Sequence, residues 1–167
     1  MLQFFYTLKK TDSRSFLIRV LEMFNIYSPE IKVNSYGKPY LSDNQLYFNL
    51  SHSGAMTILA LSDKEVGVDC EKIRSRKTDA VLRSFPESER SEILGTEDFF
   101  RHWTVKESFV KFMGTSIAKE LPHLSYVEGV LSVDDVPQEL CLHTFEIGEY
   151  LVSCCQLRSQ PYTIREL

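Results

Sequence analysis

The chain has 167 residues, of which 43% are hydrophobic and 25% are charged, and its formal net charge at pH 7 is −4. A chain of this length forms one domain, or two small lobes that share a core, without needing a disulfide or a structural metal. Proteins that bind nucleic acid over a broad surface are usually basic, so the acidic balance argues against a nucleic-acid partner.

Cysteine and histidine spacing argues against a structural zinc site. The four cysteines contain no C-x-x-C pair and the four histidines no H-x-x-x-H pair, which are spacings typical of zinc ligands. We therefore expect reduced cysteines in a cytoplasmic protein.

No stretch reaches the roughly 18 apolar residues of a membrane span, and residues 1–10 are apolar first and basic second, the reverse of a secretory signal. We expect no membrane association.

The first part of the chain predicts one helix among several strands. Residues 2–6 predict a strand, and residues 14–24 form a helix whose apolar side chains share one face: Phe16, Leu17, Val20, Leu21 and Phe24. Gly37 and Pro39 predict a turn over 35–41. We interpret 46–54, LYFNLSHSG, as a strand that passes into a Ser- and Gly-rich loop. The apolar run 55–62 predicts the next strand.

The second part repeats this order of a helical region and then strands. Residues 65–73 predict a strand, Thr78 and Pro86 are suited to helix starts, and residues 98–114 predict a helix that ends at Gly114. The stretch 125–167 predicts short strands, with a hairpin turn at Gly148. The pattern indicates an α+β fold with an N-terminal lobe over 1–64 and a C-terminal lobe over 65–167.

Three carboxylates suggest a site for a hard cation. In a strand, Asp69 and Glu71 point to one face, about 7 Å apart, while Val68 and Cys70 point to the other. The pair fits either a half-exposed strand face or a cation site. Glu107, from the helix 98–114, would add a third carboxylate. Mg²⁺ prefers oxygen ligands and is usually completed by substrate phosphates.

Basic and hydroxyl side chains near these carboxylates suggest phosphate binding. Lys106 and Lys111 of WTVKESFVK are either ordinary solvated lysines or point charges that hold phosphates. The stretch 51–54, SHSG, lacks the first glycine of the G-x-S-x-G elbow of hydrolases, so a serine nucleophile is disfavoured. Its hydroxyls and imidazole suit phosphate better, although an ordinary loop histidine is the alternative interpretation of His52.

Four motifs in this order resemble the 4′-phosphopantetheinyl transferases, in particular the longer, surfactin-synthetase-activating type: GKPY, FNLSHSG, VGVDCEK and WTVKESFVKFMG. The resemblance implies transfer of the phosphopantetheine of coenzyme A to a serine of an apo acyl, peptidyl or aryl carrier protein, with release of adenosine 3′,5′-bisphosphate. It implies a role in fatty acid, polyketide or nonribosomal peptide biosynthesis. It also implies two similar α+β lobes in one monomeric chain, with coenzyme A and Mg²⁺ in the cleft between them.

The resemblance assigns the metal and the chemistry to five residues. Asp69, Glu71 and Glu107 match the metal carboxylates of the family. Glu89 matches a glutamate proposed as the base for the carrier serine. Lys111 and Glu107 complete the expected catalytic set.

Coenzyme A is expected to contact a further set of matched residues. Contacts with its phosphates match Lys106, Lys111, Ser51 and His52. Lys38 matches a lysine near the adenine and ribose, and Arg14 matches an arginine placed on the nucleotide. Two features depart from the family. Ser116 replaces the second glycine after the helix, and the N-terminal lobe is short.

Alternatives from other classes remain open at this point. One is a non-catalytic relative that binds coenzyme A or a carrier, and another is a Mg²⁺-dependent nucleotide phosphodiesterase. The basic stretch Arg74, Arg76 and Lys77, with Arg83, is either a docking site for the acidic helix of a carrier protein or a solvated basic loop.

Overall fold

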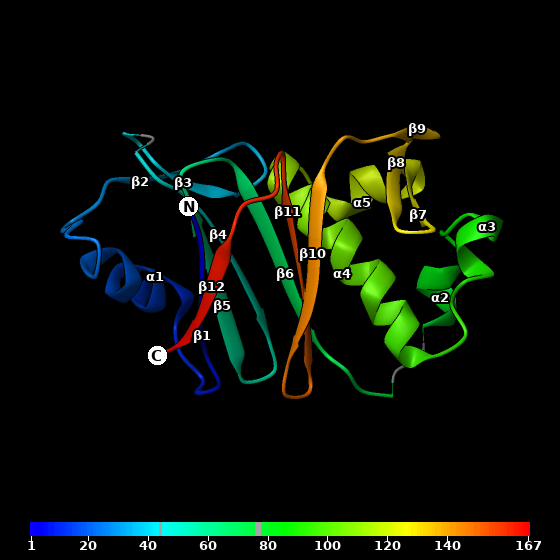
Figure 1. Cartoon of the computed structure of the whole chain (residues 1–167), viewed down its shortest axis with the longest axis horizontal. Coiled ribbons are helices and arrows are strands. Elements are labelled where there is room, and N and C mark those ends of the chain that lie inside the picture. Colours follow the sequence, from blue (N-terminus) through cyan, green and yellow to red (C-terminus); the bar gives the residue numbers. More distant parts are fainter. Residues whose placement is uncertain (44, 76–77) are drawn as a thin grey trace.

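The computed structural model describes residues 1–43, 45–75 and 78–167. The chain is an α+β protein, as the sequence predicts. Two larger sheets pack against each other in the middle of the molecule, with α1 outside one sheet and α4 outside the other (Figure 1). None of the described helices is both long enough and apolar enough to cross a bilayer.

The first sheet contains four strands in the order β12 (Tyr162–Glu166), β1 (Leu2–Thr7), β5 (Met56–Ser62) and β4 (Tyr47–Ser53). The last strand of the chain pairs parallel with β1, and the other pairs are antiparallel. Helix α1 (Ser13–Glu22) covers the outer face, and Asp12 caps it by accepting a hydrogen bond from the Ser15 N–H. The chain thus returns to the first sheet at its end, and the division at residue 64 stays a prediction.

The second sheet contains β10 (Cys141–Ile147), β11 (Tyr150–Gln156) and β6 (Val66–Lys72), all antiparallel. Helix α4 (Thr96–Met113) lies across its outer face (Figure 1). Gly114 ends this helix in the left-handed region, with φ 66°, which confirms the predicted stop. The predicted hairpin at Gly148 is also confirmed, since this glycine lies between β10 and β11.

The remaining elements are short and lie around the two sheets: β2 (Ile31–Val33), β3 (Pro39–Leu41), α2 (Asp79–Leu82), α3 (Glu87–Arg90), α5 (Ile117–Glu120), the 3₁₀ helix η1 (Leu121–His123), β7 (Leu124–Val127), β8 (Val130–Val133) and β9 (Val136–Pro137). The prediction of a loop after residue 50 is wrong, because strand β4 continues through Ser51, His52 and Ser53. Ser116 has φ −119°, so its position does not require a glycine.

The core between the two sheets is apolar. It includes the side chains of Val68 and Cys70 on β6, which confirms that this strand turns its apolar face inward. The opposite face of β6, with Asp69 and Glu71, is turned toward α4. All four cysteines are free.

Helix α4 lies directly on the backbone of β6 at Gly67. A Cβ atom built on this glycine would be 2.0 Å from the carbonyl oxygen of Ser108 and 2.3 Å from the backbone nitrogen of Phe112. The contact is between backbones, so no side-chain rotation can relieve it. Gly67 is therefore what allows α4 to approach the strand that carries Asp69 and Glu71.

We predict that Gly67→Ala will lower the free energy of unfolding by about 2 kcal/mol or more, because overpacking a tight contact costs about 1–3 kcal/mol and here the obstacle is backbone. Urea denaturation will measure the effect. Gly95→Ala is the matched control, since a Cβ there meets nothing within 4 Å, and its cost should stay within about 1 kcal/mol as an N-cap change. Equal losses for the two variants would contradict the role given to Gly67.

Candidate functional site

Side chains of β4 join the two sheets along the free edge of β6. Strand β6 is the end strand of its sheet and pairs with β11 on its other edge. Alternate β4 side chains accept hydrogen bonds from backbone N–H groups of β6: Asn49 from Val68 (2.9 Å), Ser51 from Cys70 (3.2 Å) and Ser53 from Lys72 (3.1 Å). Because buried N–H groups need partners, this row of contacts replaces a backbone ladder between the sheets.

The same serines bind the two carboxylates of β6. Ser51 Oγ donates to Asp69 Oδ1 at 2.8 Å, and Ser53 Oγ donates to Glu71 Oε2 at 2.6 Å. Asp69 is only 5% exposed, and its second oxygen, Oδ2, is buried without a hydrogen-bond partner among the described residues. The interpretation of this strand face as half-exposed and solvated is therefore wrong for Asp69.

Helix α4 brings a third carboxylate and an ammonium group to the same place. Lys111 Nζ lies 2.6 Å from Asp69 Oδ1 and donates to Ser51 Oγ at 2.9 Å. Burial, together with the charges of Asp69 and Glu71, raises the pKa of Glu107 to about 7 against the opposing effect of Lys111. For Lys111, burial acts to lower the pKa, but Asp69 and Glu107 outweigh it and the net shift is upward.

This arrangement fits a divalent cation. Three carboxylates face one another closely enough to disfavour ionisation of Glu107, and Asp69 Oδ2 has no partner. As they stand, no three histidine, cysteine or acidic side chains of the described residues converge tightly enough to chelate an ion. In this structure the ammonium of Lys111 supplies the positive charge at Asp69.

A cavity of about 220 Å³ opens beside Lys111. Its wall includes Lys38, Pro39 and Gly114. The ammonium of Lys38 pairs with Glu65 and donates to the Phe112 carbonyl oxygen at 3.0 Å. A larger cavity, of about 490 Å³, shares Lys38 and Gly114 but is lined mainly by apolar and aromatic side chains. Neither cavity is lined by the three carboxylates, and of the two only the smaller is lined by Lys111. The chemistry therefore favours the smaller cavity.

His52 and Arg14 are not brought into this cluster. His52 lies between Ser51 and Ser53 on β4, so strand alternation turns it to the opposite face, and it is exposed. Arg14 is exposed in the first turn of α1. Within the described residues, neither side chain makes a hydrogen bond or ion pair with the three carboxylates. Their expected contacts with coenzyme A stay predictions.

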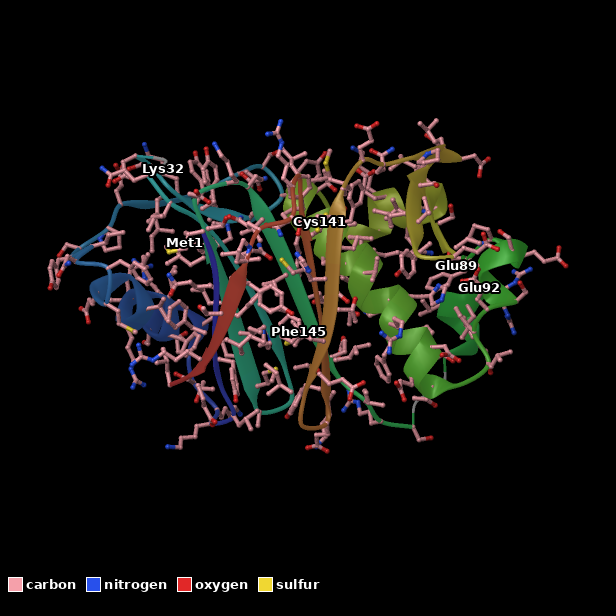
Figure 2. The ribbon with its side chains drawn as sticks, viewed as in Figure 1. Met1, Lys32, Glu89, Glu92, Cys141 and Phe145 are labelled. Carbon is pink, nitrogen blue, oxygen red and sulfur yellow. The ribbon has the colours of Figure 1, made fainter. Side chains whose placement is uncertain are left out.

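Lys106 and Glu89 form a separate buried cluster. Lys106 Nζ lies 2.6 Å from Glu89 Oε2, and both side chains are 0% exposed. The ammonium also lies 3.5 Å from the centroid of the Phe85 ring, and His102 Nδ1 lies 3.0 Å from Glu89 Oε1. Burial lowers the pKa of Lys106, and Glu89 opposes this shift. Figure 2 shows Glu89 at the end of the molecule where α3 lies, and its carboxylate contacts Lys106 and His102 of α4.

This placement corrects two expectations from the sequence. A phosphate contact by Lys106 and a catalytic base at Glu89 both require exposure to a ligand, and neither side chain has any. Adjacent residues on a helix point about 100° apart. Glu107 faces β6, so Lys106 turns away from it and toward α3.

Sequence reasoning missed Asn49 and Ser53, which share the row on β4 with Ser51. The available pattern was a polar residue at every second position over 49–53, typical of one strand face. Of the predicted basic docking residues, Arg74 and Arg83 are exposed, and Arg76 and Lys77 lie outside the described residues.

The comparison with known families decides the relationship. The sequence model of the 4′-phosphopantetheinyl transferase superfamily matches residues 65–155. The chain belongs to this superfamily. The matched range contains the three carboxylates and Lys111, whereas the β4 serines precede it.

Three relatives named as 4′-phosphopantetheinyl transferases are similar to this chain. The gsp protein of Aneurinibacillus migulanus is 30% identical over 87% of the chain, the Sfp protein of Bacillus subtilis strain 168 is 31% identical over 72%, and another Bacillus subtilis protein is 30% identical over 74%. These relatives support the predicted surfactin-synthetase-activating type. The chain spans 65%, 59% and 61% of their own lengths, less than two thirds of each.

We predict that Lys106→Met will lower the free energy of unfolding by about 3–5 kcal/mol, because it leaves the Glu89 carboxylate buried without its countercharge. Adding Glu89→Gln should recover much of this loss, since the amide is neutral. Urea denaturation of both variants measures the coupling. As a control on the same helix, Arg101→Met breaks the exposed pair with Glu97 and should cost less than about 0.5 kcal/mol. Additive effects of the first two changes would contradict a buried pair.

We predict that the three-carboxylate cluster makes the metal-free protein less stable as pH rises. The pKa of Glu107 is raised from 4.5 to about 7, so the folded state holds the proton longer. The resulting stability is present below pH 4.5 and lost as pH rises to about 7. Glu107→Gln should therefore be more stable than the parent at about pH 8, by on the order of 2 kcal/mol, and show little difference at about pH 4.

Urea denaturation in EDTA at the two pH values will measure this difference. Glu146→Gln, an exposed change on β10, serves as the control and should follow the parent at both pH values. A Glu107→Gln curve parallel to that of the parent would show that Glu107 titrates normally.

Proposed function

We propose that this chain transfers the 4′-phosphopantetheine of coenzyme A to a serine of an apo carrier protein and releases adenosine 3′,5′-bisphosphate. The observation that carries the proposal is the convergence of Asp69, Glu71, Glu107 and Lys111 at the contact between β6 and α4. Membership of the superfamily and the names of the relatives support the same reaction. The carrier can be of the acyl, peptidyl or aryl class.

Asp69, Glu71 and Glu107 would hold magnesium, which when bound neutralises the pyrophosphate of coenzyme A and orients it for attack. Lys111, which pairs with Asp69 and lines the smaller cavity, would be the ammonium group available to the substrate there. There it would stabilise the negative charge that develops on the leaving bisphosphate.

The chemical step joins the serine oxygen of the carrier to the phosphorus nearer the pantetheine. The bond from that phosphorus to the bridging oxygen breaks, and the bridging oxygen leaves with adenosine 3′,5′-bisphosphate. We assign the serine proton to Glu107, directly or through water, because Glu89 is fully buried. A carboxylate has two oxygens, so one can face the cation and the other the proton.

The remaining expectations form part of the same proposal. Lys38 and Ser51 lie at the cavity and at the carboxylates, where contacts with coenzyme A are expected. The two sheets, each with its own covering helix, would form the two lobes, with the ligand between them. We further propose a cytoplasmic monomer that acts without nucleic acid or membrane.

The test is intact-mass spectrometry of an apo carrier protein after incubation with the chain, coenzyme A and Mg²⁺. We expect a gain of one phosphopantetheine per carrier, which EDTA abolishes. Lys111→Met should slow the transfer about 100-fold, as expected for the loss of one charge-stabilising group. Lys32→Met is the control, because Lys32, labelled in Figure 2, is exposed on β2 and among the described residues pairs with Glu30.

Two outcomes would contradict the proposal. One is the absence of any mass gain on acyl, peptidyl and aryl carriers, which would favour a relative that binds without transfer. The other is consumption of coenzyme A without a carrier, which would favour a nucleotide phosphodiesterase.

A further inference from the structure

Ser53 makes two hydrogen bonds that no proposed step uses. Its Oγ accepts from the Lys72 N–H at 3.1 Å and donates to Glu71 Oε2 at 2.6 Å. A hydroxyl has only one proton to donate. Because Ser53 donates its proton to Glu71 and accepts from the backbone of β6, its hydroxyl is fixed, and it fixes one oxygen of the carboxylate.

Ser51 repeats this geometry two residues earlier. It accepts from the Cys70 N–H at 3.2 Å and donates to Asp69 Oδ1 at 2.8 Å. Each serine thus binds one carboxylate of β6 and the N–H of the residue that follows it. The spacing of two residues on β4 matches the spacing of the D-x-E pair on β6, because side chains on both strands alternate with the same period.

The third position of this row lacks the carboxylate. Asn49 accepts from the Val68 N–H at 2.9 Å, and the residue before Val68 is Gly67. Asn49 therefore contributes to the junction of the two sheets in the same way as the serines but orients no acidic group. The chain provides its own comparison between a purely structural contact and one that also holds a carboxylate.

We propose that Ser53 is a positioning residue that, together with Ser51, fixes the carboxylates of β6 for cation binding. The inference rests on the function proposed above. A free Glu71 side chain would sample several rotamers, and ordering it would oppose cation binding. With one oxygen bound to Ser53, the other is held in a defined direction. Partners of metal-binding carboxylates typically contribute about 10–100-fold to metal affinity.

The test is the binding of Mn²⁺ alone, measured from the electron paramagnetic resonance signal of the free ion, without coenzyme A or carrier. We expect Ser53→Ala to raise the dissociation constant for Mn²⁺ about tenfold. Ser53→Thr keeps the hydroxyl and should keep this constant within about twofold of that of the parent. Asn49→Ala should lower the urea midpoint, because it leaves the Val68 N–H unpaired, yet leave Mn²⁺ affinity within about twofold.

The outcomes separate this inference from the proposed function. Mn²⁺ binding by the parent that Ser53→Ala leaves unchanged would overturn the role of Ser53 and leave the metal site standing. Equal weakening by Ser53→Ala and Asn49→Ala would also overturn it, since it would reduce the effect to general loss of structure. Absence of Mn²⁺ binding by the parent would overturn both the inference and the metal site of the proposed function.

Discussion

The contact between the backbone of α4 and Gly67 determines the geometry of the whole site. A helix that packs on a strand through side chains stays farther from its backbone, whereas here the carbonyl oxygen of Ser108 lies where a Cβ atom at position 67 would be. The close approach places Glu107 and Lys111, one turn apart, over Asp69 and Glu71. A longer distance between helix and strand would leave the four side chains too far apart for their charges to shift one another's pKa.

The electrostatic consequence is a site that is unfavourable without a cation. Burial and the neighbouring acids raise the pKa of Glu107, and Lys111 offsets only part of the negative charge. Lys111 is the countercharge of Asp69, and the proposed function gives it a second role at the substrate. The Lys106–Glu89 pair differs, because its two charges are buried together with His102 and remain associated with each other. This pair links α3 to α4 and makes no contact with Asp69 or Glu71 among the described residues.

Sequence periodicity predicts which face of a helix or strand a residue lies on, but it does not predict which distant residues contact it. The alternation in VGVDCEK correctly placed Asp69 and Glu71 opposite Val68 and Cys70, and Gly114 correctly marked the end of α4. Ser51 and Ser53 were expected in a loop because serine and glycine are common there, but their partners on β6 are 18 or 19 residues away in sequence. Lys106 and Lys111 are both expected at the phosphates because they share one helix, although Lys106 turns toward α3 and Lys111 toward β6. Such contacts depend on tertiary packing, which local patterns do not encode.

The site also belongs to both sheets at once. The family match begins at residue 65 and contains the carboxylates and Lys111, but the hydroxyls that hold Asp69 and Glu71 come from β4. Residues 65–155 alone would leave the edge N–H groups of Val68, Cys70 and Lys72 without partners and would expose the apolar face of β6 that packs on β1 and β5. The last strand, β12, ties the chain back to β1 after the match ends. The first sheet is therefore a structural part of the proposed metal site, and the orientation of Asp69 and Glu71 depends on how firmly the two sheets are joined.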